Sequence, residues 1–389
     1  MAAGNLLVIQ AGGPTQVINE SLSAILDAER HQPGAGRVFG ARRGFEGLIR
    51  GDLANLSALT EAQINQVRRS PGAVLGSSRV KPSEPEFEKI LEHLRKNEIH
   101  QALLIGGNGT MHAALALSQF SRGRNYDLQV IGVPKTVDND IQGTDRCPGY
   151  ASAANFVAQS TRDLGMDVRS LAQPVSILET MGRDVGWLAA ASVMAKSDPC
   201  AAPHLVYIPE VPFDTDRFLA DLDAVLRKQG WAIVVVSEGI RNSAGRPVYE
   251  NAEPSQRDDF NRALPGGVAR YLAEVVTRRL KVRCRDEKPG LLGRASMLHV
   301  SPRDRMDAGL VGRAAHRALA AGSDRQMIAL APLERGEPGT TLLPLESVSG
   351  PARSVPKHWI CDGGLPVNEQ FSSYLRPLIG ELLEYENVF

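Results

Sequence analysis

Several signals that mark other classes of protein are scarce or missing in this sequence of 389 residues. Its four cysteines have neither CxxC nor metal-ligand spacing, so we expect reduced thiols, as in a cytoplasmic protein, and no structural metal centre. Lys plus Arg and Asp plus Glu each total 44, and this balance gives no sign of a nucleic-acid or membrane partner. The opening segment MAAGNLLVIQAGG combines a short apolar run with no basic region, which predicts neither a signal peptide nor a transmembrane span.

Aromatic residues are also scarce, at 5%, but 43% of the residues are hydrophobic, which at this length is enough for two domains with hydrophobic cores. Short apolar runs alternate with segments of helical spacing. The runs lie at residues 5–11, 102–105, 128–133, 174–178, 205–208, 232–236 and 327–333, and the helical patterns at 152–163, 186–195, 257–277 and 307–320. This alternation predicts an α/β fold with mainly parallel sheets and helices on both faces.

Glycine-rich turns follow two of these predicted strands and lead into helical patterns. One is Gly12-Gly13-Pro14-Thr15, and the other runs from Gly106 to Thr110 as GGNGT. Glycines let backbone N–H groups approach an anion, and a helix N-terminus adds a favourable dipole. The alternative is that tight strand-to-helix turns need glycine for structural reasons alone. Because such turns recur, and the third predicted strand also ends in a loop with phosphate chemistry, we favour phosphate binding.

That third loop is Pro134 to Asp140, PKTVDND, which places a lysine within five residues of two carboxylates. The preceding run LQVIGV predicts a strand that delivers the loop to the carboxyl edge of a sheet, where open α/β folds bind their ligands. Asp138 is suited to accept a proton from an attacking hydroxyl group, while Lys135 screens charge on a transferred phosphoryl group. The alternative is that Asp138 and Asp140 only cap a helix or fill turn positions.

Taken together, the motifs resemble those of the 6-phosphofructokinases, including their pyrophosphate-dependent branch, and the resemblance covers most of the chain. It is carried by GGPTQVIN at 12–19, LGSSRVK at 75–81, GGNGT at 106–110, PKTVDND at 134–140, GTDRCPGYASAA at 143–154, ETMGRDVGWLA at 179–189, SEG at 237–239 and PGLLGRAS at 289–296. The resemblance implies two doubly wound lobes with the active site in the cleft between them. It implies a phosphoryl-donor lobe of residues 1–145 with a return segment at about 293–345, and a sugar-phosphate lobe of residues 146–292 with about 346–389.

The resemblance also implies a reaction, transfer of a phosphoryl group to the C1 hydroxyl of fructose 6-phosphate to give fructose 1,6-bisphosphate. Asp138 matches the general base, Asp140 the second carboxylate of that loop, and Thr136 a hydroxyl that touches the transferred group; Lys135 and Arg183 complete the catalytic set. The expected donor phosphate ligands are Gly12, Gly13, Arg79, Gly107, Asn108, Gly109 and Thr110. Many members have an aspartate associated with Mg²⁺ at the position of Asn108. The implied cofactor is therefore Mg²⁺, with Asn108 as a weak ligand and Asp138 as a second candidate.

For the sugar phosphate, the resemblance implies six ligands: Met181, Gly182, Arg183, Glu238, Arg285 and Arg294. The two late arginines match a clamp on the 6-phosphate, and Arg285 usually reaches it from a neighbouring subunit, which implies a homodimer or homotetramer. The alternatives are solvated surface charges for both arginines and a structural carboxylate for Glu238. Two positions depart from the pattern. Pro174 and Leu291 stand where many members place polar contacts to the 6-phosphate, which makes the identity of the sugar less secure than the reaction.

The two positions that diagnose the donor disagree. Lysine in the PKT loop, here Lys135, is typical of pyrophosphate-dependent members, but these also carry aspartate where this chain has Gly109, and some ATP-dependent members combine the same glycine and lysine. Asn108, together with GGPTQVIN and LGSSRVK, is most similar to one bacterial subgroup of the pyrophosphate branch, so we favour pyrophosphate over ATP. A kinase of another sugar phosphate, such as sedoheptulose 7-phosphate, and a non-catalytic regulatory homologue, prompted by Asn108, remain alternatives. Intact Lys135, Asp138, Asp140 and Arg183 argue against the last of these.

Overall fold

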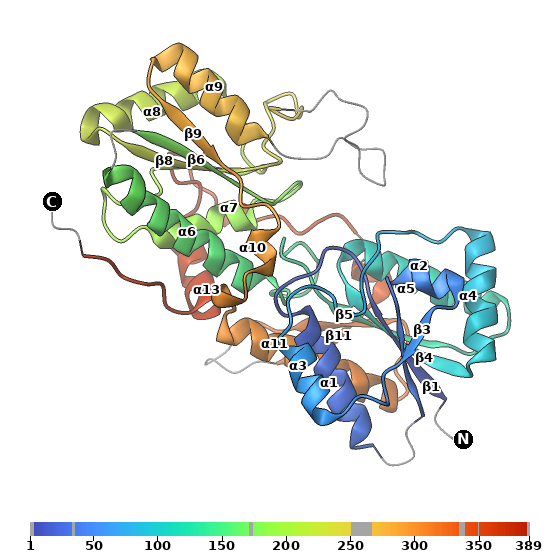
Figure 1. Cartoon of the computed structure of the whole chain (residues 1–389). Helices are drawn as coiled ribbons and strands as arrows, with labels where there is room; N and C mark the ends of the chain where they lie inside the picture. Colours follow the sequence, from blue (N-terminus) through green and yellow to red (C-terminus); the bar gives the residue numbers. More distant parts are fainter. Residues whose placement is uncertain are drawn as a thin grey trace. The chain divides into compact units, whose positions relative to one another are not determined.

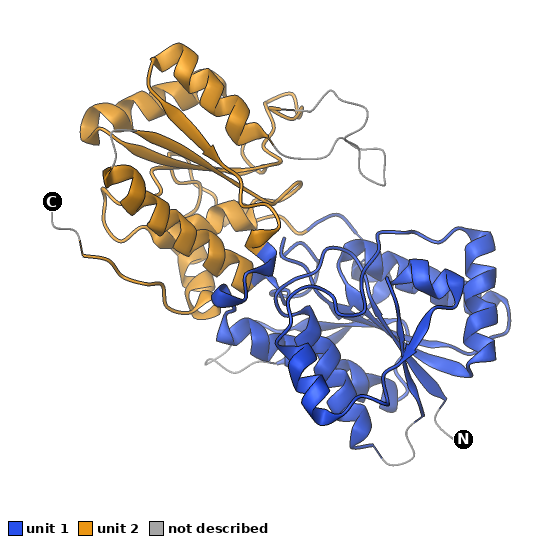
Figure 2. Ribbon diagram, in the orientation of Figure 1, with its two compact units in different colours: residues 1–150, 294–352 blue, residues 151–293, 353–389 orange. Residues whose placement is uncertain are grey.

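The computed structural model describes residues 4–32, 36–170, 174–249, 267–333, 339–348 and 350–386. The chain forms two compact units, residues 1–150 with 294–352 (unit 1) and residues 151–293 with 353–389 (unit 2) (Figure 2). Each unit has a mainly parallel sheet with helices packed on it, which confirms the predicted α/β fold. Among the described residues, no helix combines the length and the apolar character that a membrane span requires.

Unit 1 contains a sheet in the order β11-β10-β5-β4-β1-β2-β3, in which only the pairs β10–β11 and β2–β3 are antiparallel. Its strands are β1 (Asn5–Gln10), β2 (Val38–Ala41), β3 (Leu53–Asn55), β4 (Ile99–Gly106), β5 (Gln129–Pro134), β10 (Gln326–Leu330) and β11 (Thr340–Pro344). Its helices are α1 (Ile18–Arg30), α2 (Phe45–Arg50), α3 (Glu61–Arg68), α4 (Glu84–Lys96), α5 (Asn108–Gly123), α11 (Pro302–Ala320) and α12 (Leu345–Val348), with a 3-10 turn at Met297–His299.

Alternate residues of the central strands feed two separate cores in unit 1, because successive side chains point to opposite faces of a strand. Leu7, Leu104 and Val130 pack with α2, α4, α5 and α12 on one face. Val8 and Ile105 pack with α1, α3 and α11 on the other (Figure 1). The sheet is therefore covered on both faces, and its loops are left at the strand ends.

Unit 2 contains a parallel sheet in the order β7-β8-β6-β9, with β9 at one edge (Figure 1). Its strands are β6 (Val175–Thr180), β7 (Leu205–Tyr207), β8 (Ala232–Ser237) and β9 (Cys284–Glu287). Its helices are α6 (Tyr150–Ser170), α7 (Trp187–Ala191), α8 (Thr215–Gln229), α9 (Val268–Leu280) and α13 (Glu369–Ile379), with 3-10 turns at Ser192–Ala195 and Lys357–Trp359. The chain returns to unit 1 within α10 (Leu292–Ala295).

Several predicted bounds of strands and helices differ from the observed ones. The last predicted strand, 327–333, is observed as Gln326–Leu330, and the hydrogen bond from the N–H of Ala331 to the carbonyl of Gly339 at 3.0 Å continues its antiparallel pairing with β11 by one residue. The helix predicted at 307–320 begins earlier, at Pro302, where the hydroxyl of Ser301 caps it by accepting from the N–H of Asp304 at 3.3 Å. The first ten residues of the helix predicted at 257–277 lie outside the described residues, and α9 is described from Val268.

Candidate functional site

Three neighbouring strands of unit 1 deliver the predicted phosphate-binding segments to one edge of the sheet. β1, β4 and β5 run parallel and adjacent, with Gln10 level with Ile105 and Gly106 level with Pro134. The turns that follow the three strands therefore leave the same carboxyl edge (Figure 1). This is the edge at which open parallel sheets bind ligands.

The glycines of these turns differ in what requires them. Gly12 has a φ of +76°, which side chains rarely tolerate. A Cβ on Gly106 would overlap the side chain of Thr110, and one on Gly13 would overlap the guanidinium group of Arg294. In contrast, nothing lies within 4 Å of the place where a Cβ on Gly109 would sit. Gly12 and Gly106 therefore have structural reasons, Gly13 borders the flexible end of Arg294, and Gly109 leaves open space beside the start of α5.

Lys135 is the buried cation of this edge, with only 2% of its surface exposed. Its Nζ donates a hydrogen bond to the carbonyl of Gly13 at 2.7 Å. The pKa of Lys135 is lowered to about 8, chiefly by burial and also by the positive charge of Arg294, while Asp140 and Asp138 oppose the shift. Lysine and arginine thus place two positive charges beside the Gly12–Gly13 turn.

The Asp138 loop is folded back on itself before the next helix begins at Tyr150, so neither carboxylate caps a helix there. The backbone N–H of Asp138 donates to Thr136 Oγ1 at 3.1 Å. Asn139 is buried with a φ of +55°, and its Oδ1 accepts from the N–H of Cys147 at 3.0 Å. These contacts hold the backbone on both sides of Asp138.

Asp140 is clamped by Asn108, the first residue of α5. Asn108 Nδ2 donates to the carbonyl of Asp140 at 3.0 Å and to its Oδ2 at 2.9 Å. Burial raises the pKa of Asp140, and hydrogen bonds from Thr136 and Asn108 partly offset this. Within the described part of the chain, Asn108 Oδ1 and Asp140 Oδ1 are buried with no hydrogen-bond partner. Each of these two contacting residues therefore keeps one buried oxygen acceptor without a donor.

The sequence did not single out the buried ion pair that anchors this loop to α11. Arg146 Nε and Nη2 donate to Asp307 at 2.6 and 2.9 Å, and both residues are only 2% exposed. Asp304, also on α11, accepts the N–H of Gly149 at 2.8 Å. Arg146 lies within the motif GTDRCPGYASAA, but its partner is 161 residues away along the chain, and nothing in the sequence marks that pairing.

Unit 2 brings most of the predicted sugar-phosphate residues to the carboxyl edge of its own sheet. Met181, Gly182 and Arg183 follow β6, and Glu238 follows β8, which pairs with β6. A Cβ on Gly239 would overlap the carbonyl of Arg183, so glycine is required for the two loops to touch. Burial raises the pKa of Glu238 to about 7, helped by the negative charge of the neighbouring Glu179.

Arg285 and Arg79 lie apart from these groups, whereas Arg294 belongs to unit 1 and not to unit 2. Arg285 is exposed on the edge strand β9. The side chain of Arg79 is exposed, although the preceding Ser78 binds the turn by accepting the N–H of Gly12 at 3.1 Å. Arg294 lies in unit 1 with the donor-side residues, where it contacts Gly13. Pro174 and Leu291 are the two positions that depart from the family pattern. Pro174 immediately precedes β6, and Leu291 is 67% exposed.

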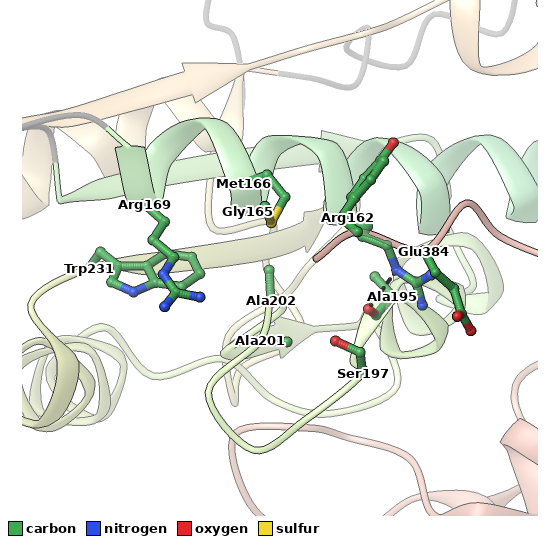
Figure 3. Close-up of a pocket in the computed structure, with 11 residues that line it drawn as sticks. Arg162, Gly165, Met166, Arg169, Ala195, Ser197, Ala201, Ala202, Trp231 and Glu384 are labelled. Atoms are coloured by element: carbon green, nitrogen blue, oxygen red, sulfur yellow. Dashed lines mark hydrogen bonds between the residues drawn. The ribbon is translucent and has the colours of Figure 1, made fainter. Parts of the chain in front are cut away.

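A cavity of about 230 Å³ in unit 2 contains none of the predicted site residues. It is lined by α6, the segment around Ala201 and the C-terminal residues Glu384 and Tyr385 (Figure 3). Its Arg162 donates to the carbonyls of Ala195 and Leu383 at 3.1 and 2.8 Å. The arginine thus ties the C-terminal segment to the body of unit 2, and the cavity is not part of the candidate site.

Comparisons with known proteins match this chain to phosphofructokinases and a related sugar kinase over most of its length. The model of the phosphofructokinase family, described as "Phosphofructokinase", matches residues 5–319. A pyrophosphate--fructose 6-phosphate 1-phosphotransferase of Xanthomonas campestris pv. campestris (strain B100) is 34% identical over 97% of this chain and 92% of the relative. A sulfofructose kinase of Alkalicoccus urumqiensis is 36% identical over 82% of this chain and 81% of the relative. The solved structure of a pyrophosphate-dependent phosphofructokinase from Nitrosospira multiformis superposes with a TM-score of 0.88 at 31% identity, covering 100% of this chain and 95% of that one.

Proposed function

The chain belongs to the phosphofructokinase family, and we propose that it transfers a phosphoryl group from pyrophosphate to the C1 hydroxyl of fructose 6-phosphate. The observation that carries the proposal is the buried Lys135, held against Gly13 in the loop that also presents Asp138 and Asp140. A desolvated cation at a phosphate-binding turn stabilises the charge that develops during phosphoryl transfer. A small, highly charged donor gains the most from such a cation.

In this proposal the donor is held by unit 1 and the sugar phosphate by residues of unit 2. Asp138 takes the proton of the C1 hydroxyl, whose oxygen attacks a phosphorus atom of pyrophosphate. The bridging P–O bond breaks, and inorganic phosphate leaves with the electron pair. Thr136 fixes the backbone of Asp138, and Lys135 screens the transferred group.

On the acceptor side, Met181 and Gly182 line the sugar, Arg183 pairs with phosphate oxygens, and Glu238 accepts hydrogen bonds from sugar hydroxyls. Charge-assisted hydrogen bonds of this kind are shorter and stronger than neutral ones. All four residues follow neighbouring strands, so the sheet fixes their spacing. Arg294 is proposed to bind a phosphate oxygen from the side of Gly13.

The unpartnered oxygens of Asn108 and Asp140 fit a hard divalent cation, and we propose that they hold Mg²⁺. In the described part of the chain, no cluster of three or more His, Cys, Asp or Glu residues is arranged to hold a metal. Two protein oxygens completed by water and substrate phosphates are typical of Mg²⁺. When bound, Mg²⁺ would neutralise charge on the donor phosphates. Asp138 is then left for proton transfer.

The direct test is the initial rate with fructose 6-phosphate, Mg²⁺ and either pyrophosphate or ATP. We expect fructose 1,6-bisphosphate with pyrophosphate and little with ATP. Equal amounts of phosphate and sugar bisphosphate should form, because each turnover splits one P–O bridge. Absence of product with both donors would refute the proposed reaction.

Sulfofructose is a second candidate acceptor. The observation that favours it is the pair Pro174 and Leu291, which offer no side-chain donor where a 6-phosphate would be bound. A sulfonate carries less charge than a phosphate and needs fewer such donors. The similarity to a sulfofructose kinase points the same way. Rates with sulfofructose and with fructose 6-phosphate, each with both donors, separate the two candidates.

We expect the active form to be at least a homodimer. Arg285 is exposed on the outer strand β9, and we propose that it binds the sugar phosphate of a neighbouring subunit. Arg285→Ala should raise KM for the sugar phosphate by about 10- to 100-fold with a smaller effect on kcat, since a charged hydrogen bond is lost. Sedimentation and steady-state kinetics measure this; a fully active monomer would contradict it.

The subunit arrangement can be tested by mixing two defective chains. A hybrid of Arg285→Ala and Asp138→Asn subunits should regain part of the activity, because one of its sites has both residues intact. No recovery in hybrids shown to have formed would place Arg285 within its own subunit's site or outside the site altogether.

A further inference from the structure

Three charged side chains lie next to one another on one face of the second sheet. β6 pairs with β9 up to Leu178 and Glu287, and with β8 up to Thr180 and Ser237. Continuing these registers by one residue places Lys288 beside Glu179 and places Glu238 just past the end of β8. Glu179 pairs with Val236 of β8, so these two side chains share a face. Alternate residues of a strand share a face, so Glu238, two residues after Val236, projects on the same side as Glu179. We call Lys288, Glu179 and Glu238 the charge row.

Glu179 is the central member of the charge row and is fixed by several donors. Its side chain is only 1% exposed. It accepts the N–H of Gly267 at 2.9 and 3.0 Å and that of Ala269 at 3.0 Å, at the N-terminus of α9. Lys288 Nζ lies 3.2 Å from Glu179 Oε1. A buried carboxylate is stable only when it is paired and hydrogen-bonded in this way.

Glu179 and Lys288 shift the pKa of Glu238 in opposite directions. The pKa of Glu238 is raised to about 7, chiefly by burial and also by the negative charge of Glu179. The backbone N–H of Gly182 and the positive charges of Lys288 and Arg183 lower it. Glu238 therefore changes protonation near neutral pH, and Lys288 favours its ionised form.

We propose that Lys288 is a positioning residue for the acceptor: by pairing with Glu179, it keeps the carboxylate of Glu238 available to the sugar hydroxyls. The inference rests on the proposed function, because it takes Glu238 as a sugar ligand. Lys288 itself touches no reacting atom. Its loss should therefore weaken binding of the sugar phosphate near neutral pH and leave the rate of the bound complex nearly unchanged.

The test compares Lys288→Met, which keeps the apolar stem, with Lys288→Arg, which keeps the charge. Fructose 6-phosphate binding is measured by calorimetry without donor, and KM and kcat are measured across the neutral range. Removing the positive charge of Lys288 should move the midpoint of the pH dependence of binding upward by about one pH unit. At a pH half a unit above the wild-type midpoint, fructose 6-phosphate should then bind about threefold more weakly, because about threefold less Glu238 is ionised. At high pH the variants should converge, because Glu238 is then ionised in all of them. Lys288→Arg should match the wild type.

The control is Lys228→Met, which removes an exposed lysine on α8 of the same unit. Infrared titration of the carboxyl band, taken as wild type minus Glu238→Gln, reports the protonation of Glu238 without any substrate. An unchanged midpoint in Lys288→Met by both methods overturns the inference, even if melting temperature falls. If the wild type binds no fructose 6-phosphate, the proposed function fails; the infrared midpoint then still shows whether Lys288 controls Glu238.

Discussion

Replacing Asp138 with asparagine is expected to lower kcat by about 10²- to 10⁴-fold, the usual cost of losing a general base. The amide keeps the shape of the side chain but cannot take the proton of the C1 hydroxyl. Two contacts that hold the backbone do not involve the replaced oxygen: the N–H of Asp138 donates to Thr136 Oγ1, and the N–H of Cys147 donates to Asn139 Oδ1. Binding of the sugar phosphate should be largely kept.

The measurement is kcat with pyrophosphate together with calorimetric binding of fructose 6-phosphate. Asp127→Asn is a suitable control, because Asp127 is exposed and precedes β5, the strand that leads to Asp138. Its kcat should equal that of the wild type. If Asp138→Asn keeps more than about a tenth of wild-type kcat, another group takes the proton.

The sequence predicted where the PKTVDND loop lies in the fold, because local chemistry determines the strand that precedes it. The run from Val130 to Val133 is buried on both faces, which is typical of a central parallel strand, and such strands end where ligands bind. The following loop carries Lys135 and Asp138 in consecutive sequence. The roles assigned to these residues remain predictions, but their common location at the sheet edge follows from the strand order.

What the sequence could not supply is the long-range pairing of charges. Glu179 sits inside an apolar strand pattern, and its partners come from α9 and from Lys288. Arg146 and Asp307 meet only because α11 packs against the sheet next to β5. Nothing in a single sequence shows which distant charges become neighbours when the chain folds, since that depends on the complete tertiary packing.

The edge strand β9 was missed for a different reason. β9, Cys284–Glu287, reads CRDE, and its middle residues Arg285 and Asp286 are exposed. An edge strand buries little, so it has neither the apolar run nor the clean alternation by which strands are identified. Its pairing with β6 is made by backbone hydrogen bonds, so the side-chain sequence of β9 hardly indicates it.

The strongest test of the donor begins with Lys135. Lys135→Ala should lower kcat with pyrophosphate by about 10²-fold or more, because a desolvated cation beside the transferred group is lost. Since Lys135 is 2% exposed, alanine also leaves a cavity, so Lys135→Met should be compared. An equal loss in both variants assigns the effect to charge.

In the wild type, kcat with pyrophosphate should fall as pH rises through about 8, where Lys135, with its lowered pKa, loses its proton.

Gly109→Asp then separates the two donors. Nothing lies within 4 Å of the Cβ that this change adds, and a carboxylate at the second residue of α5 is favourable to the helix dipole, so the chain should fold normally. An added carboxylate repels and blocks the α-phosphate of a nucleotide but leaves room for the shorter pyrophosphate. We therefore expect activity with pyrophosphate to stay within about threefold of the wild type. A wild-type enzyme that works only with ATP, and loses that activity in Gly109→Asp, would overturn pyrophosphate as the donor and leave the sugar-phosphate kinase assignment in place.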